Sequence, residues 1–337
     1  MVTVVMTENM EQETTTELVG MGLRTPVSPA QNAFYILLVA IGIVGNAIVI
    51  GVIGKSVMMD RSGGHNSDII IINLAVSNLM VSLVRNVLLI ISDLGFKLYS
   101  SKGWCQFLMG VWVWLRSVNV WSTFFLSAFH LHTLRRVAPT IGHIQGPWST
   151  YRTLLLSLGI IWILNLIYSI PAHIFSTNGN ENTTETLMLV SSTTRPLLGC
   201  VWNFPTNYTG LAYATTSMAI HEIFPIILMV ITNMTSLYTL YTHSRSRNSV
   251  QEAPVIKRVP AERRAAKVIL ALVMLFIISW GTSIISVNYF NYNRGSSVEY
   301  LLVIARFANI IFIAMSPVVL AFGHRRLRSC MKSSVSD

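Results

Sequence analysis

Residues 31–54 read QNAFYILLVAIGIVGNAIVIGVIG, a run of 24 residues without a charged side chain. A helix needs about 20 apolar residues to cross a hydrocarbon core of roughly 30 Å, and backbone amides inside lipid must bond within their own segment. This run therefore predicts a membrane-spanning helix. Six further long runs, apolar apart from a few charged residues, follow at about 68–92, 105–134, 152–173, 211–241, 265–289 and 298–322. The chain is predicted to be an all-α bundle of seven transmembrane helices.

The composition agrees with a membrane protein. Hydrophobic residues make up 52% of the chain and charged residues only 11%, against roughly 25% charged residues in soluble domains. The net charge of +10 would suit a nucleic-acid-binding protein. However, the lysines and arginines largely avoid the apolar runs and gather between alternate ones, which is typical of membrane topology. We therefore expect membrane lipid, and not nucleic acid, as a partner.

The basic residues also predict the orientation of the bundle. Sixteen of the 24 lysines and arginines fall on one side, in segments 55–61, 135–152, 245–267 and 325–332. Five fall on the opposite side, and the richer side is usually cytoplasmic. We expect a multi-pass protein of the plasma membrane, with the amino terminus outside and the carboxyl terminus inside. Its predicted parts are an extracellular segment 1–30, a transmembrane domain 31–322 and a cytoplasmic tail 323–337.

Three sequons for N-glycosylation occur in the chain. Asn182 and Asn207, which we call the loop sequons, both fall in the long loop 174–210 that is predicted to lie outside. Asn233 lies within the fifth run, where the glycosyl transferase has no access. We expect glycan on Asn182 or Asn207 and none on Asn233.

The chain contains three cysteines. Cys105 begins the third run and Cys200 lies late in the long outer loop, so both face an oxidising compartment in which disulfides persist. A bridge between them would hold the loop over the mouth of the bundle; the alternative is two free thiols. Cys330 follows the last run among basic residues, which suits palmitoylation or an ordinary free thiol.

Several motifs resemble those of the rhodopsin-like G-protein-coupled receptors. Gly45–Val49 resembles the GNxxV motif of that class, and Asn73–Ala75 resembles its NLAxxD motif, with Asn78 at the position of the usual aspartate. Cys105 and Cys200 match the disulfide of the class. Other positions depart from the class: Phe129-His130-Leu131 stands in place of DRY, Trp280 is followed by Gly281 instead of proline, and Ser316-Pro317 replaces the start of NPxxY.

These departures are similar to the vomeronasal type-1 receptors and the related fish olfactory receptors. The segment His132–Pro139 and the pair Ser316-Pro317 carry this resemblance, which covers about residues 31–330. It implies a receptor that detects a small odorant or pheromone and activates a heterotrimeric G protein. It also implies that the usual ionic latch is missing, because His130 stands where that latch requires an arginine.

Three arginines lie within the predicted spans, where charged side chains are costly and usually functional. They are Arg85, Arg116 and Arg306. Each belongs to a stripe of residues at helical spacing, which places them on one face of a helix. The stripe of the second span is Asn78, Ser82 and Arg85, and that of the third span is Trp112, Arg116, Asn119 and Thr123. The stripe of the seventh span is Arg306, Asn309 and Ser316. Lipid offers such stripes no partners, so the three faces are expected to meet inside the bundle.

Glu222, directly after His221, is the carboxylate that lies well inside a span. One acid does not neutralise three guanidinium groups, so the cavity is expected to be positive and to take a small acidic ligand. The candidate ligand-binding residues are Arg116, Trp112, Arg85, Arg306, His221 and Glu222. The alternative is that Arg116 pairs with Glu222, that Arg85 and Arg306 bond carbonyl groups or reach Asp93 and Glu299, and that Trp112 only packs.

The basic cytoplasmic segments offer a surface for a G protein. Arg135, Arg136, Arg263 and Arg264 are the candidate contacts, although the positive-inside tendency alone also accounts for them. The histidines show no spacing suited to a metal, and no catalytic grouping stands out, so we expect neither an enzyme nor a cofactor or metal. The alternatives to a chemosensory receptor are a non-olfactory receptor for an acidic metabolite or peptide and, from another class, a membrane transporter. The sequence shows no internal repeat of the kind from which many transporters are built, which weakens the transporter alternative.

Overall fold

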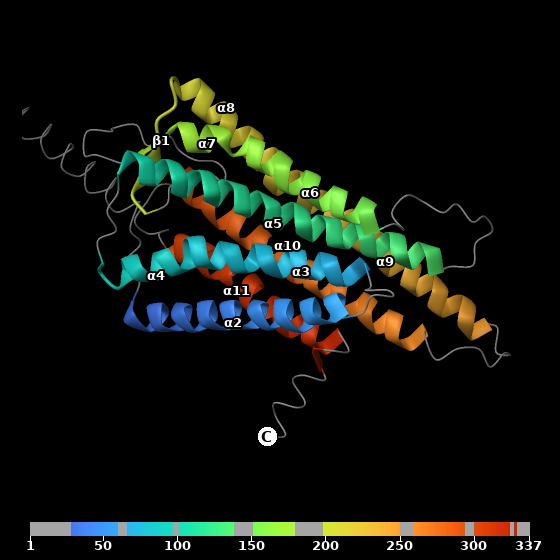
Figure 1. Ribbon diagram of the computed structural model, residues 1–337. Helices are drawn as coiled ribbons and strands as arrows, with labels where there is room; N and C mark the ends of the chain where they lie inside the picture. Colours follow the sequence, from blue (N-terminus) through green and yellow to red (C-terminus); the bar gives the residue numbers. More distant parts are fainter. Residues whose placement is uncertain are drawn as a thin grey trace, which may run out of the picture.

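The computed structural model describes residues 28–59, 66–96, 101–137, 151–178, 198–249, 259–293, 300–323 and 327–328. Within them the chain forms a bundle of long helices that run side by side (Figure 1). All seven predicted spans are helical. The first is α2 (Pro29–Met59), the third α5 (Lys102–Val137), the sixth α10 (Val259–Asn293) and the seventh α11 (Tyr300–Gly323).

The second, fourth and fifth helices are interrupted. The second consists of α3 (Asn66–Val81), a π-helical turn η1 (Ser82–Asn86) and α4 (Val87–Asp93). The fourth consists of α6 (Tyr151–Tyr168) and α7 (Ile170–Ile174), and the fifth of α8 (Asn207–Met218), a π-helical turn η3 (Ala219–Ile223) and α9 (Phe224–Ser249). Single π-helical turns within α-helices often mark functional sites.

Six helical segments are long and apolar enough to cross a membrane: 29–59, 66–93, 151–174, 208–242, 266–290 and 300–323. The helix that is not among these six is the third span, α5, which carries the polar stripe with Arg116 and runs through the middle of the bundle (Figure 1). It packs against α3, α6, α7, α9 and α10. Because neighbouring helices and not lipid surround much of α5, it does not need an apolar surface on every side.

A two-stranded hairpin joins one end of the bundle to α5. Strands β1 (Ser176–Asn178) and β2 (Cys200–Trp202) are antiparallel, with Asn178 opposite Cys200. Cys200 forms a disulfide with Cys105 near the start of α5, which confirms the predicted bridge. The hairpin, α4 and α7 lie at the same end (Figure 1), which we call the hairpin end. Sequence periodicity did not predict these strands, which are three residues each.

The segment between the fifth and sixth predicted spans is largely helical. Helix α9 continues to Ser249, and α10 already begins at Val259 with Pro260 in its first turn. Proline is favoured at the first helical position, because its missing N–H has no intrahelical partner there. Pro260 therefore fits within the first turn of α10.

The contact between α2 and α11 explains the motif around Gly45. A Cβ on Gly45 would lie 2.9 Å from Cβ and Cγ of Pro317, so only glycine admits this approach. Pro317 has no N–H, and the carbonyl of Ile313, four residues earlier, loses its helical partner. Asn46 Nδ2 donates to this carbonyl at 3.1 Å. Gly45 thus makes room for the ring of Pro317, and the next residue, Asn46, bonds the Ile313 carbonyl that has lost its helical partner.

Candidate functional site

The three predicted polar stripes meet inside the bundle, as expected. Arg116 of α5 bonds to Asn309 of α11, Asn119 of α5 bonds to Asn78 of α3, and Asn78 bonds to Ser316 of α11. Each contact joins a different pair of helices. The sequence therefore identified the faces that build the interior, although it did not identify the partner of each side chain.

Arg116 is held by an amide oxygen and two aromatic rings. Its side chain is 3% exposed, and Nη2 donates to Asn309 Oδ1 at 2.6 Å. The guanidinium lies over the ring of Trp280, and its Cζ is 5.6 Å from the ring centroid of Trp112. Its Nε has no hydrogen-bond partner among the described residues. Glu222 interacts with Arg116 electrostatically, but the hydrogen bond of Arg116 goes to Asn309.

Trp112 lies within cation–π distance of two guanidinium groups. Cζ of Arg85, in the π-helical turn η1, is 4.8 Å from the Trp112 ring centroid, and Nη1 of Arg85 donates to Asn86 Oδ1 at 3.2 Å. Arg85 and Arg116 are close enough for their charges to repel. Ring faces attract cations at roughly 0.5–2 kcal/mol each, but they do not cancel two like charges. An anion close to Trp112 would be attracted to both guanidinium groups.

Arg306 differs from the other two arginines, because it forms an ion pair with Asp93 at the end of α4. Its Cζ also lies 3.8 Å from the ring centroid of Tyr35, whose hydroxyl donates to Asn86 Oδ1 at 2.9 Å. The sequence had raised Asp93 as a partner for Arg306, whereas Glu299 lies outside the described residues. We call Arg85, Arg116 and Arg306 the arginine cluster. Within it, the positive charge of Arg306 is already balanced by the carboxylate of Asp93.

His221 and Glu222 lie in the second π-helical turn, η3, and both are buried. Trp121 of α5 donates its Nε1–H to His221 Nδ1 at 3.2 Å, and the Tyr168 ring centroid lies 4.2 Å from that of His221. Trp121 and Tyr168 were not predicted as site residues. Aromatic residues in an apolar helix give no signal that separates a site from ordinary packing.

A neutral hydrogen-bond network lies next to Arg116. Asn119 Nδ2 donates to Ser77 Oγ at 3.0 Å and to Asn78 Oδ1 at 2.6 Å. Asn78 in turn donates to Asn46 Oδ1 at 3.3 Å and to Ser316 Oγ at 3.1 Å. The network joins α2, α3, α5 and α11 without a charged group among its members. Asn78, noted in the sequence as the replacement of an aspartate, lies at its centre.

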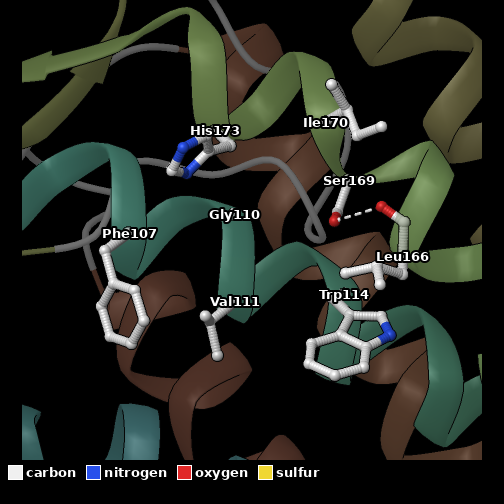
Figure 2. A pocket seen from close by; sticks show the side chains of 8 residues that line it. All are labelled: Phe107, Gly110, Val111, Trp114, Leu166, Ser169, Ile170 and His173. Carbon is white, nitrogen blue, oxygen red and sulfur yellow. Dashed lines mark hydrogen bonds between the residues drawn. The ribbon is translucent and has the colours of Figure 1, made fainter. Parts of the chain in front are cut away.

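One cavity lies outside this cluster. It measures about 250 Å³ and opens between α5 and the α6–α7 segment, where Phe107, Trp114 and His173 contribute to its lining (Figure 2). Phe107 and Ile170, also at its rim, are exposed on the outer surface of the bundle. None of the predicted ligand-binding residues lines this cavity.

The remaining predicted residues are those of the G-protein surface, the sequons and the third cysteine. Arg135 is exposed near the end of α5, opposite the hairpin end, and Arg263 and Arg264 fall in the first turns of α10. The side chains of Arg136, Arg263 and Arg264 lie outside the described residues, as do Asn182 and Cys330. Asn207 begins α8, whereas Asn233 is 2% exposed and its Oδ1 accepts a hydrogen bond from Ser127.

Comparison with known proteins decides the class. The family of 7 transmembrane receptors (rhodopsin family) matches residues 45–319. Over 295 residues the chain is 41% identical to the olfactory receptor class A-like protein 4 of Danio rerio, an alignment that covers 87% of this chain and 86% of the relative. The chain belongs to the rhodopsin family, as a receptor of the olfactory class A-like type.

More distant relatives of this olfactory class A-like receptor are similar over about half of the chain. The vomeronasal type-1 receptors A11 and 45 of Mus musculus are 26% and 24% identical over 184 residues, which is 53% of this chain and 55% of each relative. The resemblance inferred from the motifs is confirmed. The protein is a chemosensory receptor of the plasma membrane that couples a ligand to a G protein, and not an enzyme or a transporter.

Proposed function

We propose that this olfactory class A-like receptor detects a small acidic molecule, and that Arg116 is its main anchor. The observation that carries the proposal is the environment of Arg116: its buried charge is bonded to an amide oxygen and stacked on tryptophan rings. An unpaired buried charge is costly. A carboxylate, sulfate or phosphate matches the planar fork of arginine in a bidentate way.

The other candidate residues have graded roles in this proposal. Arg85 and Trp112 form the second side of the anion site, because Arg85 stacks on the Trp112 ring from which Arg116 lies 5.6 Å. Arg306 supports the cluster through its ion pair with Asp93 and contributes less to the ligand. His221 and Glu222 border the site from the fifth helix.

The orientation proposed for the receptor places the hairpin end outside the cell. The positive-inside tendency supports it, because segments 135–152, 245–267 and 325–332 follow helix ends opposite the hairpin. Segment 1–30 is then extracellular, 31–322 forms the transmembrane domain and 323–337 is cytoplasmic. The cytoplasmic residues Arg135, Arg136, Arg263 and Arg264 are proposed to contact the G protein.

The decisive experiment replaces Arg116 by glutamine, which keeps a hydrogen-bonding group of similar length and removes the charge. Wild type and variants are expressed in cells with a promiscuous G protein and screened with small carboxylic acids and their neutral amides. A charge-assisted bond contributes about 1.5–3 kcal/mol, so Arg116→Gln should weaken an acidic agonist roughly ten- to a hundredfold, since 1.4 kcal/mol is tenfold. Arg116→Lys should not fully restore the response, because lysine lacks the fork.

The matched control is the double variant Arg306→Gln/Asp93→Asn, which removes an arginine together with its ion-pair partner. Its loss of agonist potency should be smaller than that of Arg116→Gln. Surface labelling of every variant separates lost binding from lost folding. If Arg116→Gln reaches the surface and responds normally to an acidic agonist, or if only amides activate the wild type, the proposal is wrong.

A further inference from the structure

Three buried polar atoms at the junction of α6, α8 and η3 have no hydrogen-bond partner among the described residues. They are Ser217 Oγ, His221 Nε2 and Tyr168 Oη. Ser217 is fully buried and His221 is 3% exposed. The rings of His221 and Tyr168 are 4.2 Å apart, and the Tyr168 hydroxyl lies within reach of the Ser217 and Tyr213 hydroxyls, but without the geometry of a good hydrogen bond. Most buried side-chain polar atoms have a hydrogen-bond partner, so this cluster leaves hydrogen-bonding capacity unused, above all at His221 Nε2.

Trp121 fixes what His221 offers to this site. An indole N–H only donates, and Trp121 Nε1 donates to His221 Nδ1 at 3.2 Å. His221 Nδ1 therefore carries no proton, and the proton of the neutral imidazole lies on Nε2. The site presents one N–H donor from His221 and two hydroxyl groups that donate or accept.

The charge beside the site selects against an anion. Glu222 follows His221 in the same π-helical turn and interacts electrostatically with Tyr168. A carboxylate at this position repels a second negative group, whereas an uncharged oxygen meets no such penalty. Glu222 also interacts with Arg116, so the arginine cluster and this site are neighbours inside one bundle.

We propose that Ser217, His221 and Tyr168 form a second ligand subsite, which binds an uncharged acceptor oxygen such as a ketone. This inference rests on the proposed function, because the same ligand would place its acid group at Arg116. The two subsites divide the ligand by charge: the acid binds the guanidinium, and the neutral oxygen accepts from His221 Nε2–H and a hydroxyl. An acid that carries a carbonyl at some distance along its chain satisfies both.

The first test measures ligand-induced thermal stabilisation of the purified receptor. The probes are straight-chain acids of five to twelve carbons, each with and without a keto group near the chain end, and the primary amides of both series. One hydrogen bond of about 1 kcal/mol corresponds to roughly fivefold in affinity. At the best chain length, the keto acid should bind about five- to tenfold more tightly than the plain acid. Tyr168→Phe and Ser217→Ala should reduce this preference and leave plain-acid binding unchanged.

The second test needs no ligand. Tyr168→Phe and Ser217→Ala each remove a hydroxyl group that makes no hydrogen bond of good geometry, so the unfolding temperature of the free receptor should change little. Thr232→Val is the matched control, because it removes a hydroxyl that lies 2.6 Å from Ser127 Oγ; it should lower the unfolding temperature. A fall in Tyr168→Phe and Ser217→Ala as large as in Thr232→Val would show that these hydroxyls are structural and would overturn the subsite.

The two proposals fail in different ways. If plain and keto acids bind equally, the subsite is wrong and the acid site stands. If keto amides bind as well as keto acids, and Arg116→Gln changes neither, the acid site is wrong and the subsite stands. If no probe stabilises the receptor at any chain length, both are overturned.

Discussion

Replacement of Asn119 by alanine removes a side chain that ties α5 to α3. Its Nδ2 group uses both hydrogens, to Ser77 Oγ at 3.0 Å and to Asn78 Oδ1 at 2.6 Å, and the side chain is 2% exposed. Interhelical hydrogen bonds in membranes average about 0.6 kcal/mol and reach about 1.7 kcal/mol, so two lost bonds cost about 1–3 kcal/mol. The Asn78 oxygen also loses its donor, which favours the upper part of this range.

The assay is thermal unfolding of the purified receptor, with Asn288→Ala as the matched control. Asn288 Nδ2 donates only to the carbonyl of Ile284, within its own helix, at 2.9 Å. That bond persists when helices separate in the membrane, so its loss should barely change the unfolding temperature. Asn119→Ala should lower it clearly. Equal unfolding temperatures for the two variants would refute the inference that the network holds the helices together.

Three further predictions concern packing, topology and coupling. Gly45→Ala should destabilise by about 1–3 kcal/mol through overpacking against Pro317, whereas Gly51→Ala, with nothing within 4 Å of the new Cβ, should be neutral or stabilising; equal effects would contradict the close approach. N-glycosidase should increase the gel mobility of the wild type but not of a variant that lacks both loop sequons. No change in the wild type, or a change that persists in the variant, would argue against the orientation. Charge reversal at Arg135 and Arg136 should reduce G-protein activation at normal surface expression. If both variants activate the G protein as well as the wild type does, these two residues are not part of the G-protein contact.

The fold was largely predictable because the membrane restricts the possible structures. Long, mostly apolar runs that cross a membrane are expected to be helices, since lipid cannot bond a free backbone amide. All seven runs are helices, and the cysteine pair on one side of the membrane is bonded. The hairpin and the π-helical turns were not predictable, because they depend on loop contacts and on one extra residue in a helical turn, neither of which alters the pattern of apolar residues.

The site was predictable only in part. Helical spacing placed Arg116, Asn119 and Asn309 on inward faces, because an intramembrane polar side chain has few other places to point. Spacing does not specify partners, so the bond of Arg116 to Asn309 rather than to Glu222 required the packed structure. It also does not indicate which aromatic rings approach a cation, so the stacking of Arg116 on Trp280 was not anticipated.

The neutral hydrogen bonds of the network are comparable in strength to the bond that the proposed acidic ligand would form with Arg116. Together with the bond of Asn46 to the Ile313 carbonyl, five bonds of the network join different helices, and at about 0.6 kcal/mol each they amount to about 3 kcal/mol. A charge-assisted ligand bond contributes about 1.5–3 kcal/mol, a comparable amount, whereas breaking a buried ion pair costs about 3–5 kcal/mol. Arg116 lies one helical turn from Asn119, and its partner Asn309 also donates to Ser283 of α10. A ligand that takes Arg116 from Asn309 therefore acts where α5, α10 and α11 meet, beside bonds weak enough to rearrange.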